Sequence, residues 1–389
     1  MLEVGIVGLP NVGKSTLFNA LTKLNVPAQN YPFCTIDKNE AVVEYKDPLL
    51  DALAARVGAA KKLYPLIRFV DIAGLVKGAH KGEGLGNQFL SHIREVDTIL
   101  FVLRAFNAKN VSGVSKNPRE DLEIVFTELL LKDLESLEEK LAEVKAKKHR
   151  YSAEEFKQIS EVLEFFIEHL KQGYSALMAA VFYVKQKYSH TPEVVEFLKK
   201  QEFLAKFPAL QPVFDLFLLT LKPALFLFNI SYADYSQASY REYLDSMAAQ
   251  VKEYAQKFIT PSAFLVYLDA QTLFEFLDLD KEAQQLFVEE FEYFKDQFDL
   301  LEAIRNYLKL IRIFVGSEVD AREFLVYQGT SIKQAAGLIH ADLEKNFIKA
   351  KVTKVDEVIK NGIDKAAYTV VGEEYKMQDK DYFIILAGK

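Results

Sequence analysis

A cluster of glycine, lysine and hydroxyl residues near the N-terminus has the composition of a phosphate-binding loop. Residues 4–16 read VGIVGLPNVGKST and satisfy the pattern G-x-x-x-x-G-K-[ST]. In this pattern glycine lets the backbone approach the phosphates, the first helical amides bind anions, the lysine contacts the β- and γ-phosphates, and the hydroxyl ligates Mg²⁺. We expect the nucleotide to be held by Asn11, Val12, Gly13, Lys14, Ser15 and Thr16.

A strand and a helix must position this loop. The residues from Val4 to Val7 are mostly β-branched, as in a strand buried on both faces. Apolar residues then recur at helical spacing from Leu17 to Leu24. A Gly-rich turn with an incidental lysine is the alternative interpretation, and the strand–loop–helix context argues against it.

The second half of the predicted site is a metal-binding edge. Residues 67–74 read IRFVDIAG, a buried strand whose end places Asp71 to hold Mg²⁺ through water and Gly74 to offer its amide to the γ-phosphate. Thr35 lies between the phosphate loop and Asp71 in sequence, in the order of a GTPase switch, although a solvated loop threonine is commoner. The predicted Mg²⁺ ligands are Ser15, Thr35 and Asp71.

Two later segments, 98–106 and 224–231, are predicted to be buried strands, and the first predicted base contact lies at the end of the second. Asn229 falls where a GTPase carries Asn-Lys-x-Asp, but Tyr232 replaces the aspartate that accepts from guanine. Leaving those guanine donors unpaired is costly, which favours ATP over GTP. We expect Asn229 and Ile230 to contact the base, and Ser262 and Ala263 to form a small-residue loop against it.

These motifs together resemble the Obg-related YchF subfamily, the Obg-like ATPases. The resemblance rests on GLPNVGKST, NYPFCTID and DIAGLVKGAHKGEGLGNQFLSHIREVD, and it continues through 218–229 and 328–352, so it spans most of the chain. It implies a nucleotide-binding domain, an inserted helical hairpin, a C-terminal TGS domain, a preference for ATP, slow hydrolysis and association with ribosomes. The chain departs from the family at Tyr232, where relatives usually carry Glu, and in lacking a histidine between Phe106 and Pro118.

The residue that orients the attacking water is not the glutamine of many GTPases, because Leu75 follows Gly74. His80, in the glycine-punctuated loop 74–86, is the candidate catalytic residue; a solvent-facing loop histidine is the alternative. Asn11 could help bind K⁺ against the phosphates, where K⁺ substitutes for an arginine finger, or could simply form the turn.

Two apolar seams predict an antiparallel helical hairpin. Phe126 to Val144 and Phe156 to Leu170 each repeat apolar residues at three- and four-residue steps, and Ser152 with Glu155 forms a capping box. The connecting turn contains the cations Lys145, Lys147, Lys148 and Arg150. These cations either complement a helix dipole or contact ribosomal RNA.

The fold class expected is α/β. It combines a GTPase-like, mostly parallel sheet with helices on both faces, the inserted hairpin, and a small β-grasp domain at the C-terminus. The β-grasp prediction comes from strands at 310–316 and 321–327, a helix at 331–340 and a strand at 382–386. The predicted domains are 1–115 with 205–303, 116–204, and 304–389.

Composition limits the alternatives. The chain of 389 residues has a net charge of −7, one cysteine (Cys34) and no apolar run of transmembrane length. Its N-terminus enters the first strand without a signal peptide. We therefore expect a cytoplasmic protein with no DNA or membrane partner. ATP and ribosomes are the partners that the resemblance implies, and we expect the protein to be a monomer. A nucleotide-sensing regulator with negligible turnover and a GTP-preferring ribosome-assembly GTPase are the alternative functions.

Overall fold

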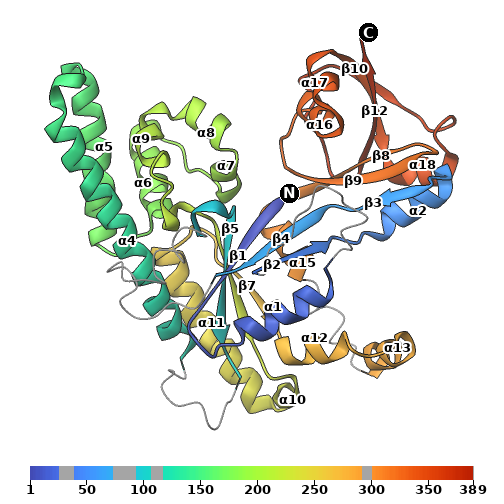
Figure 1. Ribbon diagram of the computed structural model, residues 1–389, viewed down its shortest axis with the longest axis horizontal. Coiled ribbons are helices and arrows are strands. Elements are labelled where there is room, and N and C mark those ends of the chain that lie inside the picture. The colour runs from blue at the N-terminus through green and yellow to red at the C-terminus, as the bar shows by residue number, and fades with distance from the viewer. Residues whose placement is uncertain (26–38, 73–92, 107–116, 291–299, 389) are drawn as a thin grey trace. The chain divides into compact units, whose positions relative to one another are not determined.

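The computed structural model describes residues 1–25, 39–72, 93–106, 117–290 and 300–388, which form two compact units (Figure 1). The nucleotide unit comprises Leu2–Val43 and Arg68–Leu300, and the C-terminal unit comprises Met1, Glu44–Ile67 and Leu301–Lys389. The domain boundaries expected above stay predictions. The compact units divide the chain differently, because Glu44–Ile67 packs with the C-terminal residues.

A six-stranded sheet with the order β2-β4-β1-β5-β6-β7 forms the centre of the nucleotide unit. The pairs β1 with β5, β5 with β6 and β6 with β7 are all parallel. Every residue of β5 and β6 is buried, as expected for strands covered on both faces. The predicted α/β class is confirmed. The strands are β1 (Leu2–Val7), β2 (Glu40–Glu44), β4 (Leu66–Asp71), β5 (Thr98–Arg104), β6 (Ala224–Asn229) and β7 (Phe264–Leu268).

Helices α4 (Pro118–Ala146) and α11 (Ala238–Phe258) pack on one face of this sheet, and α1 (Lys14–Lys23) packs against α12 (Ala270–Phe276). Phe101 and Phe226 of neighbouring strands stack with ring centroids 5.7 Å apart in the core beneath α4. The remaining short elements are α6 (Ala176–Tyr188), α7 (Val194–Leu198), α8 (Lys200–Lys206), η3 (Pro208–Leu210), α9 (Gln211–Phe214), η4 (Leu219–Leu221), α10 (Tyr232–Tyr235) and α13 (Lys281–Glu290).

The predicted helical hairpin is present. Helix α4 and helix α5 (Ala153–Lys171) lie side by side and are joined through the short 3₁₀ turn η2 (Lys148–Arg150) (Figure 1). The predicted seam residues are buried or packed against the core cluster of this unit. Ser152 and Glu155 form the predicted capping box, with the Ser152 hydroxyl 3.2 Å from the Glu155 amide and the Glu155 carboxylate 2.8 Å from the Ser152 amide.

The C-terminal unit is built on a second sheet, with the order β11-β10-β12-β8-β9-β3. The hairpin of β8 (Leu310–Gly316) and β9 (Asp320–Tyr327) is antiparallel, and the final strand β12 (Asp381–Ala387) lies between β8 and β10 and runs parallel to β8. A last strand inserted parallel to the first, with a helix after the first hairpin, is the predicted β-grasp arrangement. The other elements are α2 (Pro48–Val57), β3 (Lys61–Leu63), α15 (Leu300–Tyr307), α16 (Ile332–Ile339), α17 (Ala341–Lys345), β10 (Phe347–Lys354), α18 (Val355–Asn361) and β11 (Thr369–Val371).

Strands β3, β10 and β11 and helix α2 were not predicted from the sequence. Strand β3 (Lys61–Leu63) extends the C-terminal sheet by pairing in parallel with β9, and α2 packs beside it. The alternation of FIKAKVTK in 347–354, where Ala350 and Val352 are buried and the neighbouring lysines are exposed, is a signal that would have identified β10.

Candidate functional site

The phosphate-binding loop closes tightly against the sheet. It connects β1 to α1, and its backbone turns through positive φ at Asn11 (64°) and Gly13 (97°). A Cβ on Gly8 would lie 2.5 Å from the Val102 carbonyl oxygen. Glycine is therefore required at position 8 for close approach and favoured at position 13 by the left-handed backbone. Asparagine is among the residues that tolerate this conformation, which accounts for Asn11 as a turn former.

The first turn of α1 is left open to an anion. Its N-cap is Gly13, no side chain caps the helix, and its first turn contains no acidic residue. The unpaired amides at such a helix start carry the positive end of the helix dipole. Ser15, exposed in this turn, and Thr16 follow directly after Lys14. This is the part of the predicted nucleotide site that the described residues bring together most completely.

Lys14 and Asp71 are the charged pair of this edge. Lys14 is 7% exposed, and its Nζ donates to the Leu9 carbonyl at 2.7 Å. Burial lowers the pKa of Lys14 and raises the pKa of Asp71, and the attraction between the two groups opposes both shifts. Among the described residues, Asp71 Oδ1 is buried without a hydrogen-bond partner. An unpartnered buried carboxylate oxygen beside the lysine of a P-loop sequence fits a hard cation or its bound water.

Asn229 links two loops at the carboxyl edge of the sheet. It ends β6, in register with Arg104 of β5 and Leu268 of β7. Its side-chain Nδ2 donates to the Val12 carbonyl at 3.0 Å, and its Oδ1 accepts from the Ala270 amide at 3.0 Å. Both ends of the amide are thus bonded to backbone, which holds the phosphate loop to the β7–α12 connection. Base contact by Asn229 and its buried neighbour Ile230 stays a prediction.

The placement expected for Ser262 and Ala263 is wrong. They precede β7, whereas Asn229 lies at the far end of β6, and the two strands are parallel with Leu225 opposite Phe264. A strand of five residues separates them from that edge by about 17 Å. The residues at the edge are instead those following β7, Asp269 and Ala270. Their signal in the sequence is an acidic residue directly after the apolar run FLVYL.

Asp269 occupies a defined position beside Tyr232. One carboxylate oxygen accepts from the Tyr232 amide at 2.7 Å, and the other accepts from the Thr272 amide at 2.9 Å, which caps α12. The carboxylate of Asp269, beside the base-reading segment, is therefore already bonded to two backbone amides. Thr35, Gly74, Leu75 and His80 lie outside the described residues, and their assignments stay predictions.

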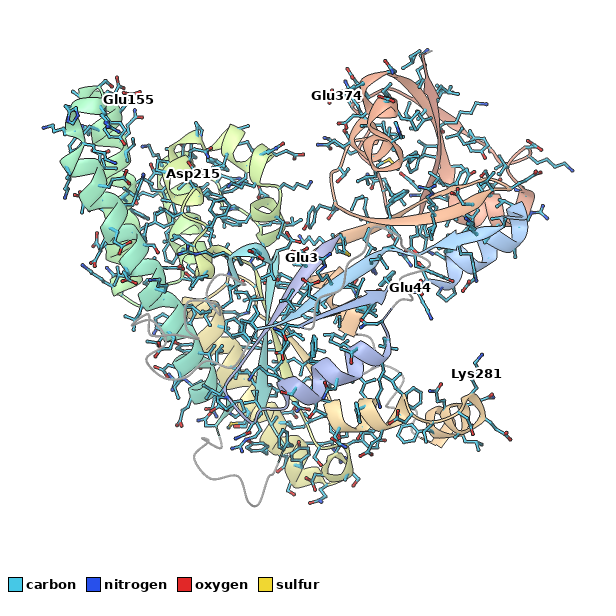
Figure 2. The ribbon with its side chains drawn as sticks, viewed as in Figure 1. Glu3, Glu44, Glu155, Asp215, Lys281 and Glu374 are labelled. Atoms are coloured by element: carbon cyan, nitrogen blue, oxygen red, sulfur yellow. The ribbon has the colours of Figure 1, made fainter. Side chains whose placement is uncertain are left out.

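The basic turn of the hairpin is only partly free. Lys145 pairs with Glu164 at 2.9 Å, and Lys147 pairs with Glu143 at 2.8 Å. The Nζ of Lys148 lies 5.0 Å from the ring centre of Phe156. Lys148 and Arg150 are both exposed. Figure 2 labels Glu155 at this free end of the hairpin. The four cations thus divide into an ion-paired set and an outward set.

A glycine-containing loop between the first strand and first helix of a parallel sheet, with Lys14 and Asp71 at the carboxyl edge, defines the class of P-loop nucleotide-binding proteins. Residues 3–147 match the family model described as 50S ribosome-binding GTPase. Residues 310–387 match the YchF GTPase C-terminal model, described as a protein of unknown function.

Similarity extends over the whole chain. The ribosome-binding ATPase YchF of Bacillus subtilis is 36% identical over 391 residues, covering 98% of this chain and 97% of the relative. Obg-like ATPase 1 of Oryza sativa is 35% identical over 389 residues, covering 98% and 90%. The solved structure of the Schizosaccharomyces pombe YchF GTPase is 30% identical, with a TM-score of 0.76 and coverage of 99% and 97%. The chain belongs to the YchF/Obg-like ATPase family, as its motifs indicate.

Within the described part of the chain, no helix combines the length and the apolar character that a membrane span requires.

Proposed function

We propose that the protein binds ATP in preference to GTP, hydrolyses it slowly with Mg²⁺, and acts as a nucleotide-dependent switch on ribosomes. The observation that carries this proposal is the open helix start of α1 beside the buried Lys14 and the partly buried Asp71. Relatives named ribosome-binding ATPase support the hydrolysis and the ribosome partner. Because ribosomes are found in the cytoplasm, we propose that the protein acts there.

Phosphate and metal binding would divide among residues of the loop edge. Lys14 would exchange its bond to the Leu9 carbonyl for phosphate oxygens, and the α1 amides would bind the same anion. Ser15 and Asp71, with Thr35, would hold Mg²⁺, whose chemistry is to neutralise charge on the transferred phosphoryl group. The unpartnered Asp71 oxygen supports this assignment. Binding of K⁺ by Asn11 remains a separate proposal.

The proposed preference for adenine rests on the absence of a carboxylate at position 232. Guanine needs an acceptor for two donors, and Tyr232 supplies no carboxylate. The nearby Asp269 is engaged by two backbone amides. Redirecting it to guanine would leave those amides unpaired, which costs about 1–3 kcal/mol for each buried group. We propose His80 as the residue that positions water, with Gly74 binding the γ-phosphate.

A specific feature favours a second candidate function. Leu75 cannot orient water, and the loop histidine usual in the family is absent between Phe106 and Pro118. These replacements would suit a regulator that senses ATP and turns over negligibly. The switch proposal and the sensor proposal share the nucleotide site and differ in phosphate release. A GTP-preferring function is disfavoured by Tyr232.

The test measures ATP and GTP affinity and phosphate release in K⁺ and Na⁺ buffers, with and without ribosomes. Lys14→Ala should lower triphosphate affinity at least tenfold, because it removes the phosphate-facing ammonium. Lys23→Ala is the matched control: Lys23 ends the same helix and pairs with Asp278 at 2.6 Å. Wild-type affinity in Lys14→Ala would reject the site, tighter GTP binding would reject the base preference, and ATP binding without turnover on ribosomes would favour the sensor.

A further inference from the structure

A pocket at the end of the helical hairpin is unused by the nucleotide site. Its volume is about 560 Å³, within the range of small-ligand pockets. It is lined by Ala146, Lys148, His149, Tyr151, Ser152, Ala153 and Phe156. These residues include two aromatic rings and an imidazole, a cation, and no carboxylate. The lining therefore suits an aromatic ligand that carries negative charge.

The pocket has a rigid frame. Ser152 and Glu155 bond to each other's backbone amides in the capping box, which fixes the chain between the turn η2 and helix α5. Tyr151 and Phe156 are partly buried and pack against the core cluster that fills the hairpin seam. Because their inner surfaces are anchored, these rings can present a pre-formed surface without being ordered by a ligand.

The cations around the pocket differ in their contacts, because two of them form ion pairs with carboxylates and one lies over an aromatic ring. Lys145 and Lys147 are directed to Glu164 and Glu143. Lys148 instead lies over the Phe156 ring at 5.0 Å, so a positive charge and an aromatic face are adjacent. Arg150, exposed, ends the same turn. The Glu155 carboxylate is held by the Ser152 amide and takes no place in the lining.

We propose that this pocket binds an unpaired nucleotide of RNA, with its base against Tyr151 and Phe156 and its flanking phosphates on Lys148 and Arg150. The inference rests on the proposed ribosome function and specifies the partner as single-stranded RNA. Aromatic side chains bind bases that have left the stack, and cations beside them follow the backbone. A paired duplex keeps its bases stacked and would meet only the charges.

The experiment uses the full-length chain and a fluorescent RNA decamer, compared with an intramolecular duplex of the same length and with a decamer of abasic nucleotides. Tyr151→Ala should weaken single-strand binding at least fivefold, as expected for loss of one stacking contact of about 1–3 kcal/mol. Tyr151→Phe should restore it. Binding of the abasic decamer should be weak and should not change with either variant.

Two cation variants separate the pocket from the general role of the hairpin end. Lys148→Ala with Arg150→Ala should weaken both RNA binding and co-sedimentation with ribosomes. The matched control, Lys145→Ala with Lys147→Ala, removes the same charge from the ion-paired set and should have a smaller effect. Thermal unfolding of each variant verifies that the hairpin is folded.

The outcomes are distinct. If the Lys148 and Arg150 variant weakens ribosome binding while duplex and abasic RNA bind as well as the single strand, the base pocket is refuted and the RNA contact stands. If none of the variants changes RNA or ribosome binding, the hairpin end is not an RNA contact and both proposals for it fail. ATP affinity, measured in parallel, reports the nucleotide site independently.

Discussion

Gly13 and Asn229 are matched to each other at the atomic level. A Cβ on residue 13 would lie 2.0 Å from Asn229 Nδ2, in addition to the cost of φ at 97°. The same Nδ2 donates to Val12. The sequence identified both residues as functional, but it assigned Asn229 to the base. The structure adds a positioning role, because the asparagine amide connects the phosphate loop to the connection after β7.

Asn229→Asp tests this role with one atom changed. The acceptor for the Ala270 amide is kept, but the donor to the Val12 carbonyl becomes an oxygen that repels it. We expect at least a tenfold loss of triphosphate affinity and a loss of stability of about 1–3 kcal/mol. Titration calorimetry and urea denaturation measure the two effects. Asn19→Asp, on the exposed face of α1, is the control, and equal losses in both variants would contradict the positioning role.

A buried acid in the C-terminal unit makes stability depend on pH. Glu323 is 2% exposed, and burial together with the neighbouring Asp47 raises its pKa to about 9. Asp47 itself is bonded to Arg312 at 3.0 Å, and Arg312 also pairs with Asp379. At neutral pH the folded protein therefore holds a proton on Glu323 that the unfolded chain has released.

Since the folded state binds the extra proton between about pH 4.5 and 9, its stability falls as pH rises through that window, by up to about 1.4 kcal/mol per pH unit. Glu323→Gln mimics the protonated form at every pH. Urea denaturation from pH 6 to 9 should show a flatter decline for this variant than for the unsubstituted protein. Parallel pH profiles would mean that Glu323 does not hold the proton.

At the scale of elements, a buried carboxylate of α4 bonds the hairpin to η4, the short element that precedes β6. Asp133 of α4 is 1% exposed and accepts from the Leu219 amide at 2.7 Å, the Thr220 amide at 2.7 Å and the Thr220 hydroxyl at 2.6 Å. A few residues on, Lys222 donates to the Arg94 carbonyl at 2.9 Å and to the Val96 carbonyl. The short element η4 thus joins α4 to the segment that enters β5.

Asp133→Ala should destabilise the protein by about 3–5 kcal/mol, because three donors lose a buried charged acceptor. Asp133→Asn, which keeps a carbonyl oxygen, should cost less. Asp215→Ala provides the control, since Asp215 is exposed and its carboxylate accepts from the nearby Gln211 side chain. Urea denaturation measures all three variants. If Asp133→Ala lowers the free energy of unfolding no more than Asp215→Ala does, the bonds of Asp133 to Leu219 and Thr220 are not needed for stability.

Elements with strong local patterns were predictable from sequence. The strand before Gly8, the hairpin seams and the Ser152 cap follow from spacing within a few residues. The position of Ser262 was not predictable in the same way, because small residues look alike at either end of a strand. Only the parallel pairing of β6 with β7 shows that Ala270 is at the edge with Asn229. Likewise, the ion pair between Lys145 of α4 and Glu164 of α5 depends on how the two helices pack, and spacing along the sequence does not reveal it.

At the scale of the whole molecule, the family and the fold class were predictable, but the path of the chain between units was not. Residues 44–67 lie within the first 115 and contain no sequence break that marks a change of unit. Their assignment depends on apolar contacts with residues far along the chain: Leu50 and Leu53 share a core cluster with Phe314 and Tyr382. Long-range packing of this kind leaves no local periodicity to detect.

This nested path has a consequence for synthesis. Helix α2 leaves the ribosome about 260 residues before Phe314, its partner in the C-terminal core. At a synthesis rate of about 5–20 residues per second, Leu50 and Leu53 remain without these C-terminal partners for roughly ten to fifty seconds. The segment Glu44–Ile67, between β2 and β4 of the nucleotide unit, therefore stays without its partners until the C-terminal residues have been synthesised. During that interval we expect the apolar surface of α2 to be open to aggregation and to chaperone binding.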